Sequence, residues 1–255
     1  IFTFYILLLL GFFLNAQNLK SPDNNLDLNF SIDEKGRAFY SLNFHEKPVI
    51  LNSGLGFMLK DNVEWMKIDT LDMMNNFKIL NVTFDSVDEY WNPVWGEESE
   101  IRNNYNEMFV ELQQIESERK VNIRFRLFDE SLGFRYEFPL QEKLGSFIII
   151  DEKTEFAMAG DHTAMWIPGD YDTQEYNYTT SKLSEIEQKS IEFKEENVSM
   201  YRFSNWAVQT ALMMKSQNGL YINIHEAALI EYSAMHLEFN PVNMTFESHL
   251  TPDAY

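Results

Sequence analysis

Short runs in which apolar and polar residues alternate are the feature that most constrains the fold of this chain. From Leu26 onward they recur in LDLNFSI, FKILNVTF, RKVNIRFRLF and LYINIH, with turn sequences such as EKG, DESLG and SQNG between them. A period of two places every second side chain on one face, which is typical of strands with one buried face. The one segment with helical spacing is SKLSEIEQK, residues 181–189.

Many short strands separated by turns predict an all-β fold, a large antiparallel sandwich with few short helices. The chain has 255 residues, of which 45% are hydrophobic, so it can bury one sizeable core. We find no fixed-period repeat and no Gly-rich, Ser-rich or Pro-rich linker in the sequence.

Charge and cysteine content exclude several classes of function. The formal net charge is -20, from 40 acidic and 20 basic residues, so a nucleic acid partner is not expected. Cysteine is absent, which excludes a disulfide framework, a thiol nucleophile and thiolate metal ligands.

The N-terminus indicates export. Residues 1–16 form an apolar run that ends in the small residue Ala16, as in the core and cleavage site of a signal peptide. The run is shorter than the roughly 20 residues of a membrane span, although a truncated membrane anchor stays open as an alternative. We therefore expect a partial signal peptide, a secreted or periplasmic protein without a membrane span in the mature chain, and a chain cut from a larger protein at both ends.

Glu226 occupies an unusual position for a carboxylate. If the strand LYINIH continues, Glu226 shares a face with Ile222 and Ile224, while His225 points to the opposite side. An isolated charge on an apolar face costs several kcal/mol. Three solutions stay open: the strand ends and Glu226 lies at the sheet rim, Glu226 pairs with Lys or Arg, or it binds a metal. A zinc motif of the H-E-x-x-H type is excluded because position 229 is Leu.

Two segments, residues 88–107 and 164–180, are rich in Trp, Tyr, Pro, Gly and carboxylates. Aromatic rings beside acidic residues occur on sugar-binding surfaces and also in buried loops and domain interfaces. We expect both segments mainly to pack the domain or its interface with a further domain, with sugar contact as the alternative. Trp91, Trp95 and Trp166 are the side chains that distinguish the two.

Several longer stretches resemble the N-terminal domain of glycoside hydrolase family 97, the family of the α-glucosidase in Bacteroides-type starch utilisation, which also contains α-galactosidases. They are INIHEAALIEYSAM, WIPGDYDTQEYNYTT, VWGEESEIRNNYNE, DESLGFRYEF and SHLTPDA. The resemblance covers nearly all of residues 26–255, and it implies a galactose-mutarotase-like β-super-sandwich over residues 17–255, itself C-terminally incomplete. A catalytic (β/α)8 barrel would follow, and it is absent here.

The resemblance also implies the site. Glu226 would bind Ca2+ together with carboxylates of the barrel, and Glu247, Ser248 and His249 would contact an α-linked oligosaccharide. The general acid and its partner would lie in the barrel, so no catalytic residue is assigned in this chain. The expected function is the N-terminal part of a secreted, calcium-dependent exo-α-glycosidase that is an α-glucosidase or an α-galactosidase. The alternatives are a non-catalytic carbohydrate-binding β-sandwich and a mutarotase-like sandwich with its own active site.

Overall fold

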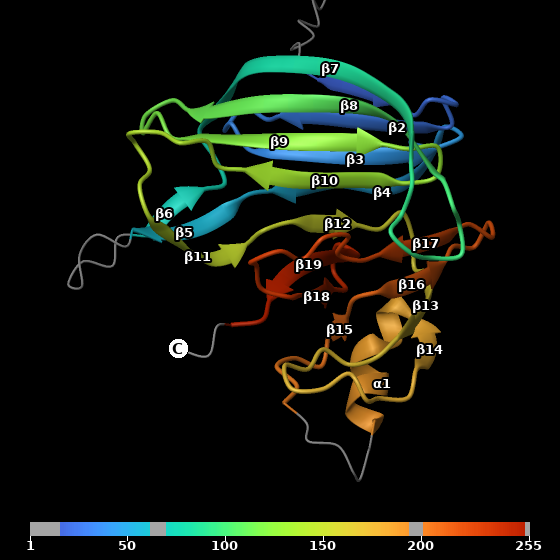
Figure 1. Ribbon diagram of the computed structural model, residues 1–255. Coiled ribbons are helices and arrows are strands. Elements are labelled where there is room, and N and C mark those ends of the chain that lie inside the picture. Colours follow the sequence, from blue (N-terminus) through green and yellow to red (C-terminus); the bar gives the residue numbers. More distant parts are fainter. Residues whose placement is uncertain (1–15, 62–69, 194–200, 253–255) are drawn as a thin grey trace, which may run out of the picture.

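The alternating runs form strands in the computed structural model, which describes residues 16–61, 70–193 and 201–252. Within these residues the strands build five antiparallel sheets (Figure 1). The expected signal peptide of residues 1–16 lies outside the described residues except for Ala16. No helix in the described ranges combines the length and the apolar character needed to cross a membrane.

Two four-stranded sheets face each other in the upper part of Figure 1. The first has the order β1 (Gln17–Lys20), β2 (Leu26–Ile32), β3 (Ala38–Phe44) and β4 (Lys47–Leu55). The second has the order β10 (Leu132–Glu137), β9 (Lys120–Leu127), β8 (Ile101–Gln114) and β7 (Phe77–Trp91). Their inner faces meet at Phe30 and Phe125, both fully buried, with ring centroids 5.8 Å apart. This is the packing of a β-sandwich.

The remaining sheets extend the sandwich at one side and below. The three-stranded sheet has the order β11 (Phe147–Glu152), β5 (Phe57–Asp61), β6 (Thr70–Met73). The next has the order β12 (Glu155–Ala157), β19 (Thr245–Leu250), β18 (Met235–Asn240), β15 (Ala207–Gln209). The last has the order β14 (Thr179–Lys182), β13 (Thr163–Trp166), β16 (Leu212–Lys215), β17 (Tyr221–Ile224). The predicted helical segment forms the 3-10 helix η1 (Leu183–Glu185) and the helix α1 (Ile186–Glu192).

The upper and lower parts share one hydrophobic core. Hydrogen bonds also join them, since the Tyr40 hydroxyl donates to the Glu155 carbonyl at 2.9 Å and the Ala157 amide donates to Ser53 Oγ at 2.9 Å. The predicted all-β, antiparallel sandwich with few short helices is confirmed.

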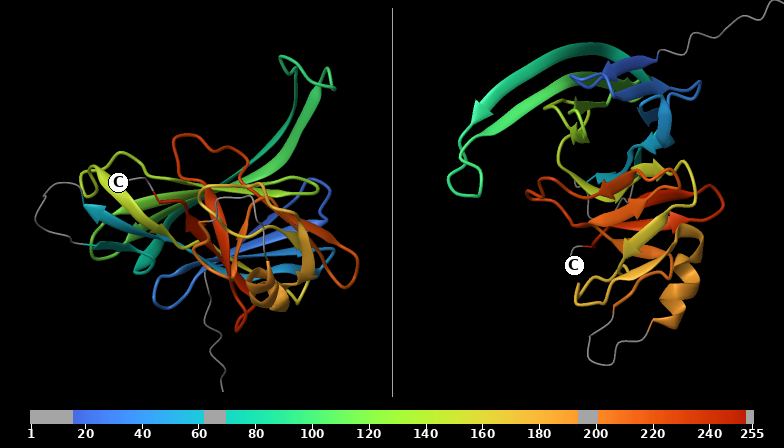
Figure 2. Two further views of the ribbon diagram at one scale, coloured as in Figure 1. Left: turned by 90° about the horizontal axis from the view of Figure 1, so that it is seen from below. Right: turned by 90° about the vertical axis from the view of Figure 1, so that its right-hand side faces the viewer.

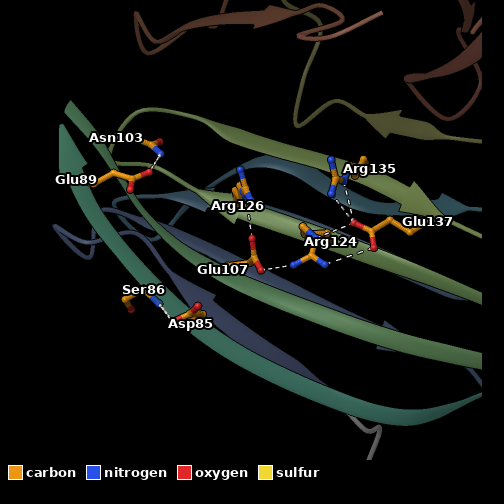
Figure 3. Close-up of polar contacts among 9 residues, drawn as sticks. All are labelled: Asp85, Ser86, Glu89, Asn103, Glu107, Arg124, Arg126, Arg135 and Glu137. Carbon is orange, nitrogen blue, oxygen red and sulfur yellow. Dashed lines mark hydrogen bonds and ion pairs between the residues drawn. The ribbon is translucent and has the colours of Figure 1, made fainter. Parts of the chain in front are cut away.

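The outer face of the sheet β7–β10 carries an ionic network (Figure 3). Glu107 lies between Arg124 and Arg126, and it accepts a hydrogen bond from Arg126 Nε at 2.8 Å. Glu137 accepts from Arg124 Nε at 2.7 Å and from Arg135 Nε at 2.9 Å. These arginines are the polar members of the alternating runs, and the network ties β8, β9 and β10 together on the face that is not in the core.

Strands β7 and β8 continue beyond the rest of their sheet as a two-stranded arm, residues 87–105. The last pair between β8 and β9 is Asn106 with Leu127, whereas β7 and β8 stay paired as far as Trp91 and Ile101. The right view of Figure 2 shows this hairpin projecting from the body of the domain. Trp91 is 50% and Trp95 90% exposed, while Trp166 is 1% exposed. Trp166 therefore packs within the domain, as expected. Trp91 and Trp95 are not covered by the described residues, and the interface with a further domain stays a prediction for them.

Candidate functional site

Glu226 lies just past the end of β17. The strand ends at Ile224, which is buried, so Glu226 is two positions beyond the last ladder pair. Glu226 is half-buried and His225 is exposed, with His225 Nδ1 3.1 Å from the Glu226 carbonyl oxygen. Of the three solutions for this carboxylate, the structure supports the first, a position at the sheet rim.

The Glu226 carboxylate has no cationic partner among the ion pairs of the described residues. Burial raises its pKa above the usual value, and the nearby Glu152 raises it further, while a hydrogen bond from the Met235 amide opposes both. A carboxylate in this setting is more easily kept ionised when a cation approaches it.

Glu152, at the end of β11, is the second carboxylate of this region and is 9% exposed. Its Oε1 accepts a hydrogen bond from the Thr154 hydroxyl at 2.6 Å, and its Oε2 accepts one from the Tyr232 hydroxyl at 2.7 Å. Thr154 is in turn 2.8 Å from the Tyr136 hydroxyl. Both oxygens of Glu152 are therefore satisfied inside the domain, in contrast to those of Glu226.

Strand β19 presents its three predicted site residues on different faces. Glu247 and His249 lie on one face of the strand, and Ser248 on the other. Ser248 is 4% exposed, and its hydroxyl donates to the Glu152 carbonyl at 2.6 Å and accepts from the Thr154 amide at 3.2 Å. Ser248 thus has a structural role in this domain, and sugar contact by Ser248 stays a prediction.

The carboxyl of Glu247 is partly buried, and burial raises its pKa. Glu155 and Glu238 are the cross-strand neighbours of Glu247 on β12 and β18, and both add to the shift, while Lys153 opposes it. Three carboxylates side by side make this face of the sheet strongly acidic.

His249 belongs to an aromatic cluster that it forms with Tyr171 and Phe203. The Phe203 ring stacks on His249 with centroids 3.9 Å apart and on Tyr171 with centroids 4.8 Å apart. The Tyr171 hydroxyl is 2.5 Å from His249 Nε2. Burial lowers the pKa of His249, so its imidazole favours the neutral form. The cluster fixes the orientation of the ring at the end of the sandwich.

Asp170 organises the loop WIPGDYD that carries Tyr171. It is 3% exposed, and its Oδ2 accepts from the Tyr176 hydroxyl at 2.6 Å and from the Tyr201 amide at 2.7 Å. Its Oδ1 accepts from the Asp172 and Thr173 amides at 2.8 and 3.2 Å. Burial would raise the pKa of this carboxyl, but the hydrogen bonds outweigh burial and hold the pKa below its usual range.

The fold brings Glu226 and β19 to the same end of the sandwich. Glu226 accepts from the amide of Met235, and Met235 is the cross-strand partner of Leu250, the neighbour of His249. Calcium needs six to eight oxygen ligands. Across the described ranges no group of three or more potential ligands could hold a metal ion. Glu226 could thus supply one carboxylate to Ca2+. The other ligands would have to come from outside the described residues.

Sequence reasoning missed Glu152, Tyr232, Tyr171 and Phe203. Tyr232 stands six positions after Glu226 in HEAALIEY, and Glu152 ends the apolar run FIIIDE, so both had a local signal. Their contact joins positions 80 residues apart, which periodicity does not reveal.

Fold and site together define an antiparallel β-sandwich domain with an acidic face around Glu247. The chain belongs to the glycosyl-hydrolase 97 N-terminal family, whose model matches residues 19–252. In sequence it is 24% identical over 231 residues to a retaining alpha-galactosidase of Bacteroides thetaiotaomicron, covering 86% of this chain and 30% of that protein.

Solved structures agree. A glycoside hydrolase family 97 enzyme from Pseudoalteromonas sp. strain K8 in complex with acarbose matches 92% of this chain with a TM-score of 0.76 and 33% identity. A variant of a family 97 enzyme from the same strain, in complex with panose, gives a TM-score of 0.75. A beta-arabinopyranosidase, 18% identical with a TM-score of 0.72, shares the fold. The chain spans 32% of the Pseudoalteromonas enzyme, about a third of its length.

Proposed function

We propose that this chain is the N-terminal sandwich portion of a secreted, calcium-dependent exo-acting α-glycosidase, an α-glucosidase or an α-galactosidase. Membership of the family supports glycoside hydrolysis, and the relatives supply the substrate classes: an alpha-galactosidase by name, and a family 97 enzyme bound to acarbose or panose. The catalytic acid and its partner would lie in a (β/α)8 barrel in the same protein, which is the proposed partner of this domain.

The observation that carries the proposal is the placement of Glu226. Its carboxylate is half-buried at the sheet rim, has no cationic partner in the described part of the chain, and has a raised pKa beside Glu152. In the proposed enzyme Glu226 supplies one ligand of a calcium ion that it shares with the barrel. A bound calcium ion supplies positive charge that polarises the glycosidic oxygen. Glu247, Ser248 and His249 would contact the α-linked sugar from the neighbouring strand.

The substitution Glu226→Gln in the full-length enzyme tests this. It keeps the shape of the side chain and removes its charge, so we expect the calcium Kd to rise by at least about tenfold and turnover to fall. The melting temperature should change little because Glu226 lies outside the core. Calorimetric titration with calcium and kinetics at several calcium concentrations measure this. Glu97→Gln, an exposed residue of the arm region, is the matched control. Unchanged calcium dependence of Glu226→Gln would remove the metal assignment.

A second candidate, a non-catalytic carbohydrate-binding sandwich, is favoured by the exposed Trp91 and Trp95 of the arm. The 255-residue chain alone distinguishes the two. Under the first proposal it hydrolyses neither nitrophenyl α-glucoside nor nitrophenyl α-galactoside. Its tryptophan fluorescence does not change with maltooligosaccharide, because the arm would then be a surface for the barrel and not a sugar site. A saturable fluorescence change would favour the second candidate. Hydrolysis of either nitrophenyl glycoside by the chain alone would overturn the first proposal, because the sandwich would then have its own active site.

We further propose export to the periplasm or the outside of the cell, with cleavage after Ala16. The apolar run before Ala16 supports this proposal. Mass spectrometry of the mature N-terminus should find Gln17 as the first residue. An intact apolar run in the mature protein would favour a membrane anchor.

A further inference from the structure

The segment that carries Glu226 is tied to the body of the sandwich by the side chain of Tyr232 and, at its end, by a backbone hydrogen bond from Thr251 to Ala234. Residues 225–234 connect β17 to β18 without forming a strand. Within this segment Leu229 and Ile230 are exposed. The Tyr232 hydroxyl donates to Glu152 Oε2 at 2.7 Å, while its ring remains 39% exposed. The hydrogen bond therefore adds to the partial burial that holds Tyr232 in place.

The acceptor of this hydrogen bond is itself immobile. Glu152 Oε1 is held by Thr154 at 2.6 Å, and the Glu152 carbonyl is held by the Ser248 hydroxyl at 2.6 Å. The Ser248 amide donates in turn to the Thr154 carbonyl at 2.8 Å. These bonds fix Glu152 to β12 and β19, so Tyr232 is tied to the same strand that carries His249.

Stability alone is a weak reason for this arrangement. Glu152 is 9% exposed, and no ion pair within the described ranges involves it. Burying a carboxylate without a cation is costly, and its hydrogen bonds only partly offset the cost. A neutral pair of the same shape would fix the segment as well. The carboxylate of Glu152 also lies near Glu226, which adds negative charge at the end of the sandwich where Glu226 lies.

Two contacts hold the chain that follows Glu226. The Met235 amide donates to its carboxylate, and Tyr232 fixes the chain three residues before Met235. The Tyr232 hydroxyl donates to Glu152 and so does not occupy an oxygen of Glu226, whose carboxylate accepts from the Met235 amide.

We propose that Tyr232 and Glu152 are positioning residues: their hydrogen bond holds residues 225–234 so that the Glu226 carboxylate is presented in one fixed geometry to a divalent cation, and the charge of Glu152 adds to the attraction. This rests on the proposed role of Glu226. Groups that orient a metal ligand in this way usually change metal affinity by about 10- to 100-fold when they are removed.

The test uses Tyr232→Phe in the full-length enzyme, with Tyr221→Phe as the matched control. Tyr221 is 62% exposed on the neighbouring strand β17. For Tyr232→Phe we expect faster hydrogen exchange in residues 225–234 and a calcium Kd raised about tenfold. Tyr221→Phe should change neither. Glu152→Ala should speed exchange as Tyr232→Phe does and raise the calcium Kd further, because it also removes the charge. Glu152→Gln removes the charge and keeps an oxygen that can accept from Tyr232. Glu152→Gln should thus retain slow exchange and lose only the part of the affinity that comes from charge.

The two readouts separate the outcomes. Slow exchange in Tyr232→Phe would overturn the proposal because the segment would then be held by other contacts. Faster exchange with an unchanged calcium Kd would also overturn it, since the hydrogen bond would then be merely structural. If Glu226→Gln itself leaves the calcium Kd unchanged, the proposed function fails, and the exchange data still report whether Tyr232 holds the segment.

Discussion

Phe125→Ala should lower the free energy of unfolding by about 3–5 kcal/mol, the usual loss for a phenylalanine removed from a closed core. Phe125 is fully buried between the two upper sheets, with ring centroids 5.8 Å from Phe30 and 5.8 Å from Phe134. Neither neighbour can move far enough to fill the cavity, because each is packed in its own sheet. Denaturant unfolding followed by tryptophan fluorescence measures the loss.

Phe84→Ala is the control, because Phe84 is 54% exposed on β7 and should cost less than about 0.5 kcal/mol. A loss below about 1 kcal/mol for Phe125→Ala would mean that the two sheets do not pack as described.

Asp170→Ala should have an effect of similar size, through polar contacts instead of packing. Asp170 accepts hydrogen bonds from the Tyr176 hydroxyl and from the backbone amides of Asp172, Thr173 and Tyr201. A hydrogen bond to a charged group contributes about 1.5–3 kcal/mol, and donors that lose a buried acceptor cost more. We expect a loss of at least about 3 kcal/mol, together with a disordered Tyr171.

The pH dependence provides a second measurement of the same contacts. Because the pKa of Asp170 is lower in the folded protein than the usual 3.8, its contribution is complete above pH 3.8 and is lost as the pH falls through the folded pKa. The difference in stability between the unchanged protein and Asp170→Ala should therefore be constant near neutral pH and narrow only in strong acid. Asp172→Ala, an exposed residue of the same loop, should show neither effect.

Much of the fold could be predicted from the sequence because period-two alternation determines which side chains are buried. Ile224 is buried, as the pattern requires, and the segment SKLSEIEQK is helical. The cost of a charge on an apolar face was enough to limit the environment of Glu226 to three possibilities. The alternating pattern does not show at which residue a strand ends. It therefore could not predict that β17 ends before Glu226.

The arm also shows that alternation does not reveal where strand pairing ends. Alternation indicates that β7 and β8 pair, but not that they remain paired after β9 has ended. The segment around Trp91 and Trp95 has the amino-acid composition of a packed loop. Both side chains nevertheless lie exposed on the arm. The contact of Tyr232 with Glu152 was likewise inaccessible, since it depends on how three sheets meet.

The order of strands along the chain has a consequence for folding during synthesis. Strands β1–β4 and β7–β10 pair with close neighbours in sequence, so the upper sandwich can close while the chain is still being made. By contrast, β12 has to wait for β19, and Thr154 and Ser248 are 94 residues apart. Closing so long a loop is slow, because its entropy is lost before any contact compensates it. The end of the molecule that carries Glu226 and His249 is thus the last to become ordered, and during that time its apolar strands are open to wrong pairing.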